Sequence, residues 1–345
     1  AGSLLLFKPP SEQDAIPDSQ TALLSSDKPS IAVLPFTNMS GDPEQEYFSD
    51  GMTEDLITDL SKLSGLFVVA RNSSFAYRGQ SMDLRQIADE LGVLYLLEGS
   101  VRRQGDQVRI NAQLIDGATG GHIWAERFDG TMSDIFELQD GVNQKIVEEL
   151  SISLTLQEQE QFSKVETSNP EAYDLLLRGL EQFHLSTRET TLEARKLYKQ
   201  AIELDPEYAR AYANLALTYA SDVNFLRSAD KEESIRLGLQ YATTAIELDD
   251  SIPQIYFTRS ALYLAQGNHA AAIEAGRRMV EVHPTYADGY GMLAFALCWG
   301  GDQPGALEAI RKMHQIDPQV SYLALALEGR ILFFMQRYEE AAALV

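Results

Sequence analysis

The sequence predicts an α+β domain, with a mixed sheet and helices, followed by an all-α solenoid. Three observations predict this order. The first half mixes short apolar strand patterns with helical ones. Near its end, three β segments follow one another between glycine-bearing loops. The second half is helical throughout and repeats one short string at a near-constant interval, which indicates stacked helix pairs.

The composition narrows the classes of function. Lys and Arg total 28 against 51 Asp and Glu in 345 residues, a net charge of −23. A chain this acidic is not expected to bind the phosphates of DNA or RNA, or an anionic membrane surface. A lone cysteine, Cys298, excludes an intrachain disulfide and any multi-cysteine metal site. No apolar run reaches the roughly 18 residues that span a bilayer, so we expect a membrane link only through a helix upstream of Leu4–Phe7.

The first elements follow from local patterns. Residues 1–28 carry Ser, Pro and scattered charge without apolar periodicity, which is typical of a linker. The apolar run at 31–36 predicts a short strand, and Pro35 marks its end or a sheet edge because proline cannot donate to a ladder. Apolar residues at helical spacing predict a helix from Phe48 to Leu63. The run at 66–70 predicts a buried strand.

The α+β domain is expected to span residues 29–163, and its remaining elements follow from similar patterns. A short helix from Leu84 should stop at Gly92, a residue that tolerates the left-handed conformation at a helix end. A long amphipathic helix begins at Ile135 and can continue to about Gln161. Between them, strands expected at 94–103, 107–116 and 122–129 form an antiparallel meander. The order of elements predicts one sheet with helices on a face.

Related strings end successive units of the second half. They are AIELDP at 201–206, AIELDD at 245–250, MVEVHP at 279–284 and MHQIDP at 313–318. Their spacings are 250 − 206 = 44, 284 − 250 = 34 and 318 − 284 = 34, and 34 is the period of tetratricopeptide repeats, each a pair of antiparallel helices. We expect about four full repeats and a truncated fifth over residues 169–345. The second unit has ten extra residues (44 − 34), expected at 221–231 between its helices.

Long strings of the first half resemble the TolB amino-terminal-like domain over roughly residues 28–154. They are IAVLPFTNMSGDPEQEYFSDGMTEDLITDLSKL, FVVARNSSFAYRG and ELGVLYLLEGSVRRQGDQVRINAQLIDGATGGHIWAERFDG. The resemblance implies a module that precedes tetratricopeptide repeats in bacterial membrane signalling proteins. There it lies across a membrane helix from a class III adenylate/guanylate cyclase, a winged-helix DNA-binding domain or a protein kinase. It implies a regulatory or sensory region, periplasmic rather than cytoplasmic, and supplies no ligand.

We predict no catalytic, cofactor-binding or metal-ligating residues in this chain, and leave any cyclase activity to a longer protein. The sequence has no P-loop, no strand–GxGxxG–helix unit, no GxSxG and no HExxH. Its five histidines are scattered one per element. Asp42, Glu44 and Glu46 lack the full set of Ca²⁺ ligands, so a solvated acidic loop is expected. Trp124 and Phe128 alternate along one strand and should pack on the last helix rather than line a ligand cleft.

The groove of the repeat array is the best candidate for a functional surface. In such solenoids the first helix of each pair lines a concave face that holds peptides or partner helices. The motif offsets place five candidate residues there: Arg210, Asn214, Phe257, Phe295 and Trp299. The three aromatic residues are apolar anchors for a protein or peptide, or are buried by the next repeat; both alternatives stay open. The rival function is a structural scaffold or dimerisation module, a homodimer included, that senses nothing.

Overall fold

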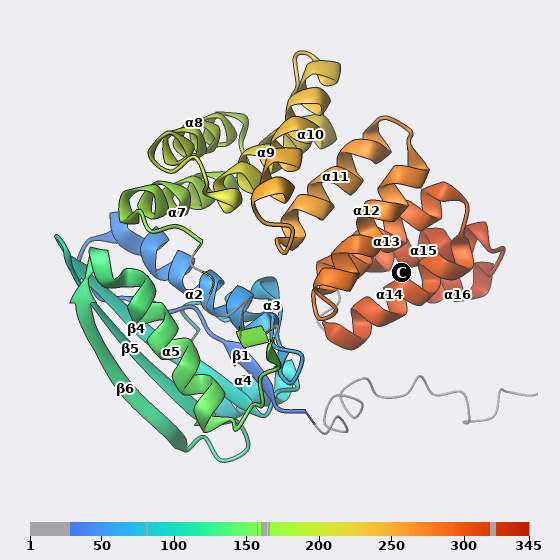
Figure 1. Cartoon of the computed structure of the whole chain (residues 1–345). Coiled ribbons are helices and arrows are strands. Elements are labelled where there is room, and N and C mark those ends of the chain that lie inside the picture. Colours follow the sequence, from blue (N-terminus) through green and yellow to red (C-terminus); the bar gives the residue numbers. More distant parts are fainter. Residues whose placement is uncertain are drawn as a thin grey trace, which may run out of the picture.

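The computed structural model describes residues 28–80, 82–156, 158–159, 164, 166–317 and 322–344. The predicted linker at residues 1–28 lies outside these ranges, apart from Lys28. A six-stranded mixed sheet with helices comes first, and paired helices follow that arch over one side of it (Figure 1). The predicted order, an α+β domain and then an all-α solenoid, is confirmed. No helix among the described residues has the length and apolar character that crossing a membrane requires.

The sheet joins parallel and antiparallel strands. They are β1 (Ser30–Val33), β2 (Thr37–Asn38), β3 (Phe67–Val68), β4 (Tyr95–Gln104), β5 (Gln107–Asp116) and β6 (His122–Thr131). Their order is β3-β1-β4-β5-β6, with β2 beside β4. β1 runs parallel to β3 and β4, whereas β4, β5 and β6 form the predicted antiparallel meander.

Two predicted strands are too long. β1 ends at Val33, and only one further backbone bond, from Leu34 N to Leu97 O at 2.8 Å, extends its pairing. Pro35 then has no N–H to donate, so the prediction of a strand at 31–36 is wrong in its length. The strand expected at 66–70 is reduced to the two residues of β3.

Helices cover both faces of the sheet. They are η1 (Pro43–Gln45), α2 (Glu46–Ser61), α3 (Arg71–Phe75), α4 (Leu84–Leu91), η2 (Met132–Asp134) and α5 (Ile135–Glu149). Ile31 and Val33 of β1 belong to one buried cluster with residues of α2 and α5, whereas Ala32 packs with α4 on the other face. Trp124 is buried in the first of these clusters and so packs with the last helix, as predicted. Alternate strand residues point to opposite faces, so the prediction of helices on one face only is wrong.

Two helices of this part, α4 and α5, end in left-handed caps. α4 stops where predicted, with Gly92 at φ 66°. The prediction that the last helix continues to about Gln161 is wrong, because α5 ends at Glu149 and Ser151 is left-handed at φ 52°. Ser151 N donates to Glu148 O and Ile152 N to Val147 O, both at 3.0 Å, a Schellman cap.

Paired helices make up the second part. They are α7 (Pro170–His184), α8 (Arg188–Leu204), α9 (Ala209–Asn224), α10 (Lys231–Leu248), α11 (Pro253–Ala265), α12 (His269–Val282), α13 (Ala287–Gly300), α14 (Gln303–Ile316), α15 (Tyr322–Phe334) and α16 (Tyr338–Ala343). α9 and α10 have 16 and 18 residues, against 13 and 14 in α11 and α12. The insertion in the second unit therefore lengthens both helices as well as the loop, rather than the loop alone.

Candidate functional site

The concave side of the helical array holds α2 of the sheet domain (Figure 1). Gly51 of α2 faces Leu177 of α7 so closely that a Cβ on it would lie 2.5 Å from Leu177 Cδ2. A larger residue at this position would require the Leu177 side chain to move. Buried residues of α2, such as Leu56, belong to one continuous hydrophobic cluster with Leu176 and Tyr208 of the array. The two parts of the chain therefore share a core.

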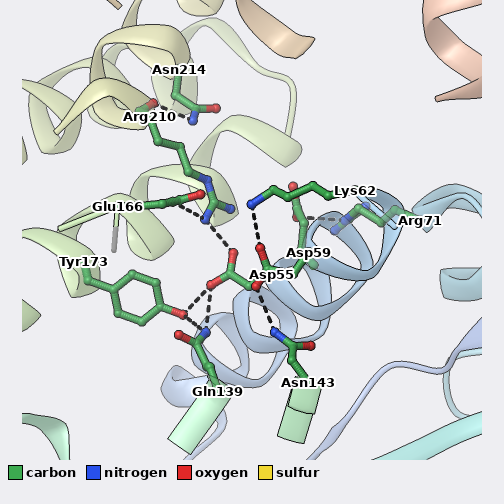
Figure 2. Close-up of polar contacts among 11 residues, drawn as sticks. Asp55, Asp59, Lys62, Arg71, Gln139, Asn143, Glu166, Tyr173, Arg210 and Asn214 are labelled. Carbon is green, nitrogen blue, oxygen red and sulfur yellow. Dashed lines mark hydrogen bonds and ion pairs between the residues drawn. The ribbon is translucent and has the colours of Figure 1, made fainter. Parts of the chain in front are cut away.

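A buried ion pair lies at the centre of this contact (Figure 2). Asp55 of α2 is 7% exposed, and its Oδ1 lies 2.6 Å from Arg210 Nη1 of α9, at an angle that falls short of a hydrogen bond. The other oxygen, Oδ2, accepts from Tyr173 Oη at 2.5 Å and from Gln139 Nε2 at 3.0 Å. Arg210 Nη1 also lies 3.4 Å from Glu166 Oε2. Residues of α5, α7 and α9 thus converge on one carboxylate of α2.

Burial changes the acid–base character of these groups. It raises the pKa of Asp55 from 3.8 to about 6, although the charge of Arg210 opposes the shift. Burial alone would lower the pKa of Arg210, but Asp55 and Glu166 raise it well above its usual value. The adjoining cavity measures only about 50 Å³, too small for a substrate. The network links α2 and α5 of the first part to α7 and α9 of the array.

A second polar contact is made by Asp174, the residue that follows Tyr173 in α7. Asp174 Oδ1 accepts from Tyr47 Oη at 2.7 Å and from Arg103 Nη1 of β4 at 2.5 Å. Burial and the neighbouring Asp174 raise the pKa of Tyr47 well above its usual value. Tyr47 therefore stays a neutral donor to this carboxylate at physiological pH.

An open cleft of about 270 Å³ remains between α2 and α3 on one side and the first helix of each pair, α7, α9, α11 and α13, on the other. Arg71 of α3 lines this cleft together with Arg210. The Nε of Arg71 donates to Glu54 Oε2 at 2.9 Å, and its guanidinium lies 4.0 Å from the Phe75 ring centre. Two further contacts bridge the two parts of the chain, one in the lining of the cleft and one outside it. Thr285 Oγ1 donates to Ser61 O at 3.0 Å, and Ser73 Oγ donates to Asp317 Oδ1 at 2.9 Å.

The predicted site residues fall into two groups. Arg210 and Asn214 do line the concave side, but the chain itself occupies them: Arg210 pairs with Asp55, and Asn214 Nδ2 donates to the carbonyl of Arg210 at 2.9 Å. The guanidinium of Arg210 is therefore already paired within the chain. Contact of Arg210 and Asn214 with a partner stays a prediction.

The aromatic candidates lie further along the array. Phe257 is half-buried on α11 at the repeat position of Ala213 (257 − 213 = 44), which is fully buried. Phe295 and Trp299 lie together on α13, with ring centres 6.1 Å apart, and Trp299 is 48% exposed. Phe295 occupies the repeat position of Leu217 (295 − 217 = 44 + 34), which lines the cleft. That Phe295 and Trp299 face the concave side, as their repeat positions predict, stays a prediction.

Four residues of the buried network were not predicted from the sequence: Asp55, Gln139, Glu166 and Tyr173. In the sequence, Asp55 looks like any surface acid within the helical pattern of α2, so no local signal marks it as buried. Among the described residues, no group of three or more His, Cys, Asp or Glu side chains could hold a metal ion.

Comparisons with known proteins match both parts of the chain. Residues 26–152 match the family model of the HilA/YgeH-like transcriptional regulator, second domain, and residues 192–222 match a TPR repeat. Over 231 residues, 67% of this chain, it is 50% identical to putative adenylate cyclase 3 of Rhizobium meliloti (strain 1021). The match spans only 39% of that relative's length.

Solved structures resemble parts of the fold. The MamA protein aligns with a TM-score of 0.38 and 19% identity, over 50% of this chain and 87% of MamA. TolB from Acinetobacter baumannii aligns with a TM-score of 0.28 and 19% identity, over 36% of this chain and 29% of TolB. The match of residues 192–222 to a TPR repeat confirms that the second half holds a tetratricopeptide repeat. The first half matches a HilA/YgeH-like model, and its resemblance to the TolB amino-terminal-like domain stays a prediction.

Proposed function

We propose that this chain is the non-catalytic regulatory region of a bacterial membrane signalling protein, an adenylate or guanylate cyclase, and that it binds a protein or peptide through its repeat array. The 50% identity to a relative named putative adenylate cyclase supports the class of protein. The boundaries 29–163 and 169–345 belong to the same proposal. So does a periplasmic position, which the TolB resemblance implies; the cytoplasm is the alternative.

The single observation that carries the binding proposal is a pair of exposed aromatic residues at one repeat position. Trp299 of α13 and Phe333 of α15 are separated by one period (333 − 299 = 34) and are 48% and 57% exposed. The guanidinium of Arg330 lies 5.7 Å from the Trp299 ring centre. Exposed aromatic and arginine side chains that lie together are enriched at the centres of protein interfaces.

The two ends of the concave face thus differ in chemistry. At α7 and α9 the face is polar and holds α2 through Asp55. At α13 and α15 it presents aromatic rings. Residues 169–345 carry 16 Lys and Arg against 24 Asp and Glu, a charge of −8. A partner with apolar side chains and some basic character fits this surface, because the opposite charge steers it in.

Trp299→Ala tests the proposal. Loss of a central aromatic anchor should weaken partner binding by about 2 kcal/mol, roughly 30-fold. The melting temperature should barely change, because the ring is half exposed in the free protein. Phe225→Ala is the matched control: Phe225 is 62% exposed, with Arg227 stacked 4.7 Å from its ring centre, but it lies at the end of α9.

The measurement is a pull-down from a cell-envelope extract, followed by titration of the retained protein against each purified variant. The wild type and Phe225→Ala should retain the same protein, and Trp299→Ala should lose it. A Trp299→Ala variant with unchanged affinity and a lowered melting temperature would make the ring a core residue and remove the basis of the proposal.

The scaffold or dimerisation alternative has one observation in its favour. Strand β6 has ten residues and lies at the edge of the sheet. A long free edge can pair with another chain.

A further inference from the structure

Strand β6 borders the sheet, and within the described parts of the chain β5 is its one partner strand. Figure 1 shows it as the outermost strand. Its ten residues leave a row of backbone N–H and C=O groups facing outward. The opposite border, β3, has two residues. The sheet therefore has one edge long enough to accept a further strand.

The side chains of β6 divide between its two faces. Trp124 is buried on the face of α5, and Phe128 packs against Gly141 of that helix. Arg127 and Asp129 point to the other face and are exposed, with Arg127 Nε 2.9 Å from Asp129 Oδ2. Asp129 also accepts from Arg109 Nε of β5 at 2.5 Å. Arg109 lowers the pKa of Asp129, which therefore stays ionised.

The order of these charges makes the strand complementary to a second copy of itself, related by a two-fold axis. When a strand pairs antiparallel with its own copy about an axis perpendicular to the sheet, directly opposed residues share a face. With the axis at Phe128, Arg127 lies opposite Asp129 of the second copy, and Asp129 lies opposite Arg127 of the second copy. The Cβ atoms of such pairs lie about 4.5–5.5 Å apart.

The neighbouring registers oppose like charges. An axis at Glu126 places two carboxylates opposite each other, an axis at Arg127 places two guanidinium groups there, and an axis at Asp129 again places two carboxylates. Like charges directly opposed on neighbouring strands are destabilising. Among the registers centred on the charged stretch, Phe128 is the centre that yields two opposite-charge pairs.

We propose that two copies of this chain associate through antiparallel pairing of β6, with the two-fold axis at Phe128 and reciprocal Arg127–Asp129 ion pairs. Arg127 can turn to the second copy without stranding Asp129, because Arg109 stays bound to that carboxylate. The pairing spans 125–131, a small contact, and the charge of −23 on each copy opposes it. The dimer is therefore weak and depends on its two ion pairs.

Charge exchange tests the register. Asp129→Arg opposes two pairs of guanidinium groups, and Arg127→Asp opposes two pairs of carboxylates. Each substitution should raise the dimer dissociation constant at least about tenfold. A mixture of the two single variants should form a heterodimer, because every opposed pair then joins an acid to a base. The double variant R127D/D129R should regain self-association for the same reason.

Sedimentation velocity over a concentration series of the full chain measures these constants, and circular dichroism checks that each variant is folded. Glu233→Arg is the control: it makes the same charge change in an exposed ion pair of α10, and should leave the constant within about twofold of wild type. A wild type that is monomeric throughout the series, or single variants whose mixture does not associate, overturns the proposal. Trp299→Ala should leave the dimer intact, so failure of partner binding and failure of dimerisation can be told apart.

Discussion

Replacing Asp55 by asparagine should remove a pH dependence of stability that the buried carboxyl creates. Burial raises its pKa in the folded chain from the ordinary 3.8 to about 6. The folded state therefore holds this proton more tightly than the unfolded state does. The group's contribution to stability is fully present below about pH 4 and is lost as the pH rises to about 6.

The magnitude follows from the two pKa values. A change from 3.8 to about 6 corresponds to about 3 kcal/mol of differential stability. The free energy of unfolding of the wild type, minus that of Asp55→Asn, should fall by about this amount between pH 4 and pH 7. The slope is the test, because the variant also changes the contacts of Arg210 and so shifts the difference by a constant.

Urea unfolding followed by circular dichroism, at a series of pH values, gives the required free energies. Arg210→Met provides a second arm. It removes the opposing cation, so the pKa of Asp55 should rise further and the loss of stability should extend to higher pH. At neutral pH this variant should cost about 3–5 kcal/mol, because it removes one partner of a buried ion pair. A difference between wild type and Asp55→Asn that stays flat from pH 4 to pH 7 would refute the buried ionisable network.

Two other predictions concern the core. The change of pattern between residues 163 and 169 suggests two independently soluble pieces, but the structure predicts otherwise. After cleavage at a protease site inserted there, the two halves should co-elute on size exclusion, because α2, α7 and α9 share one hydrophobic cluster. Halves that separate freely and stay folded would contradict this. Gly99→Ala should lower the free energy of unfolding by about 1–3 kcal/mol, since a Cβ there would lie 2.5 Å from Asn111 O and 2.6 Å from the Phe36 ring. Thermal unfolding measures the loss, with Gly121→Ala, at a more open position, as the control. Equal melting temperatures of the two variants would argue against the close contact at Gly99.

Local patterns predict much of this fold. The meander follows from alternation and glycine-bearing loops, and the end of α4 follows from Gly92. Errors arise where apolar character continues beyond the regular backbone. Leu34 and Phe36 are buried but lie outside β1, and Ile152 packs against the core after α5 has turned. Apolar periodicity reports burial, whereas the end of an element depends on donors and caps.

The site was predictable only in part, for a different reason. The repeat period predicts that Arg210 and Asn214 lie on the concave side, and both line the cleft beside α2. It cannot show that the partner of Arg210 is Asp55, which precedes it by 155 positions (210 − 55). Pairing between distant segments depends on how the two parts pack, which no local pattern encodes. The role of Phe257, Phe295 and Trp299 in partner binding stays a prediction.

The unequal borders of the sheet bear on how this acidic chain avoids forming fibres. A sheet that grows without limit needs a free edge on each side of every subunit added. Here one border is the two-residue β3, which offers almost no ladder, and the other is the ten-residue β6. Pairing at β6 uses the one long edge of each copy and leaves the short β3 at both ends of the joined sheet. Association by this route closes at two chains, because the strands in the described part of the chain leave no second long edge for a further copy.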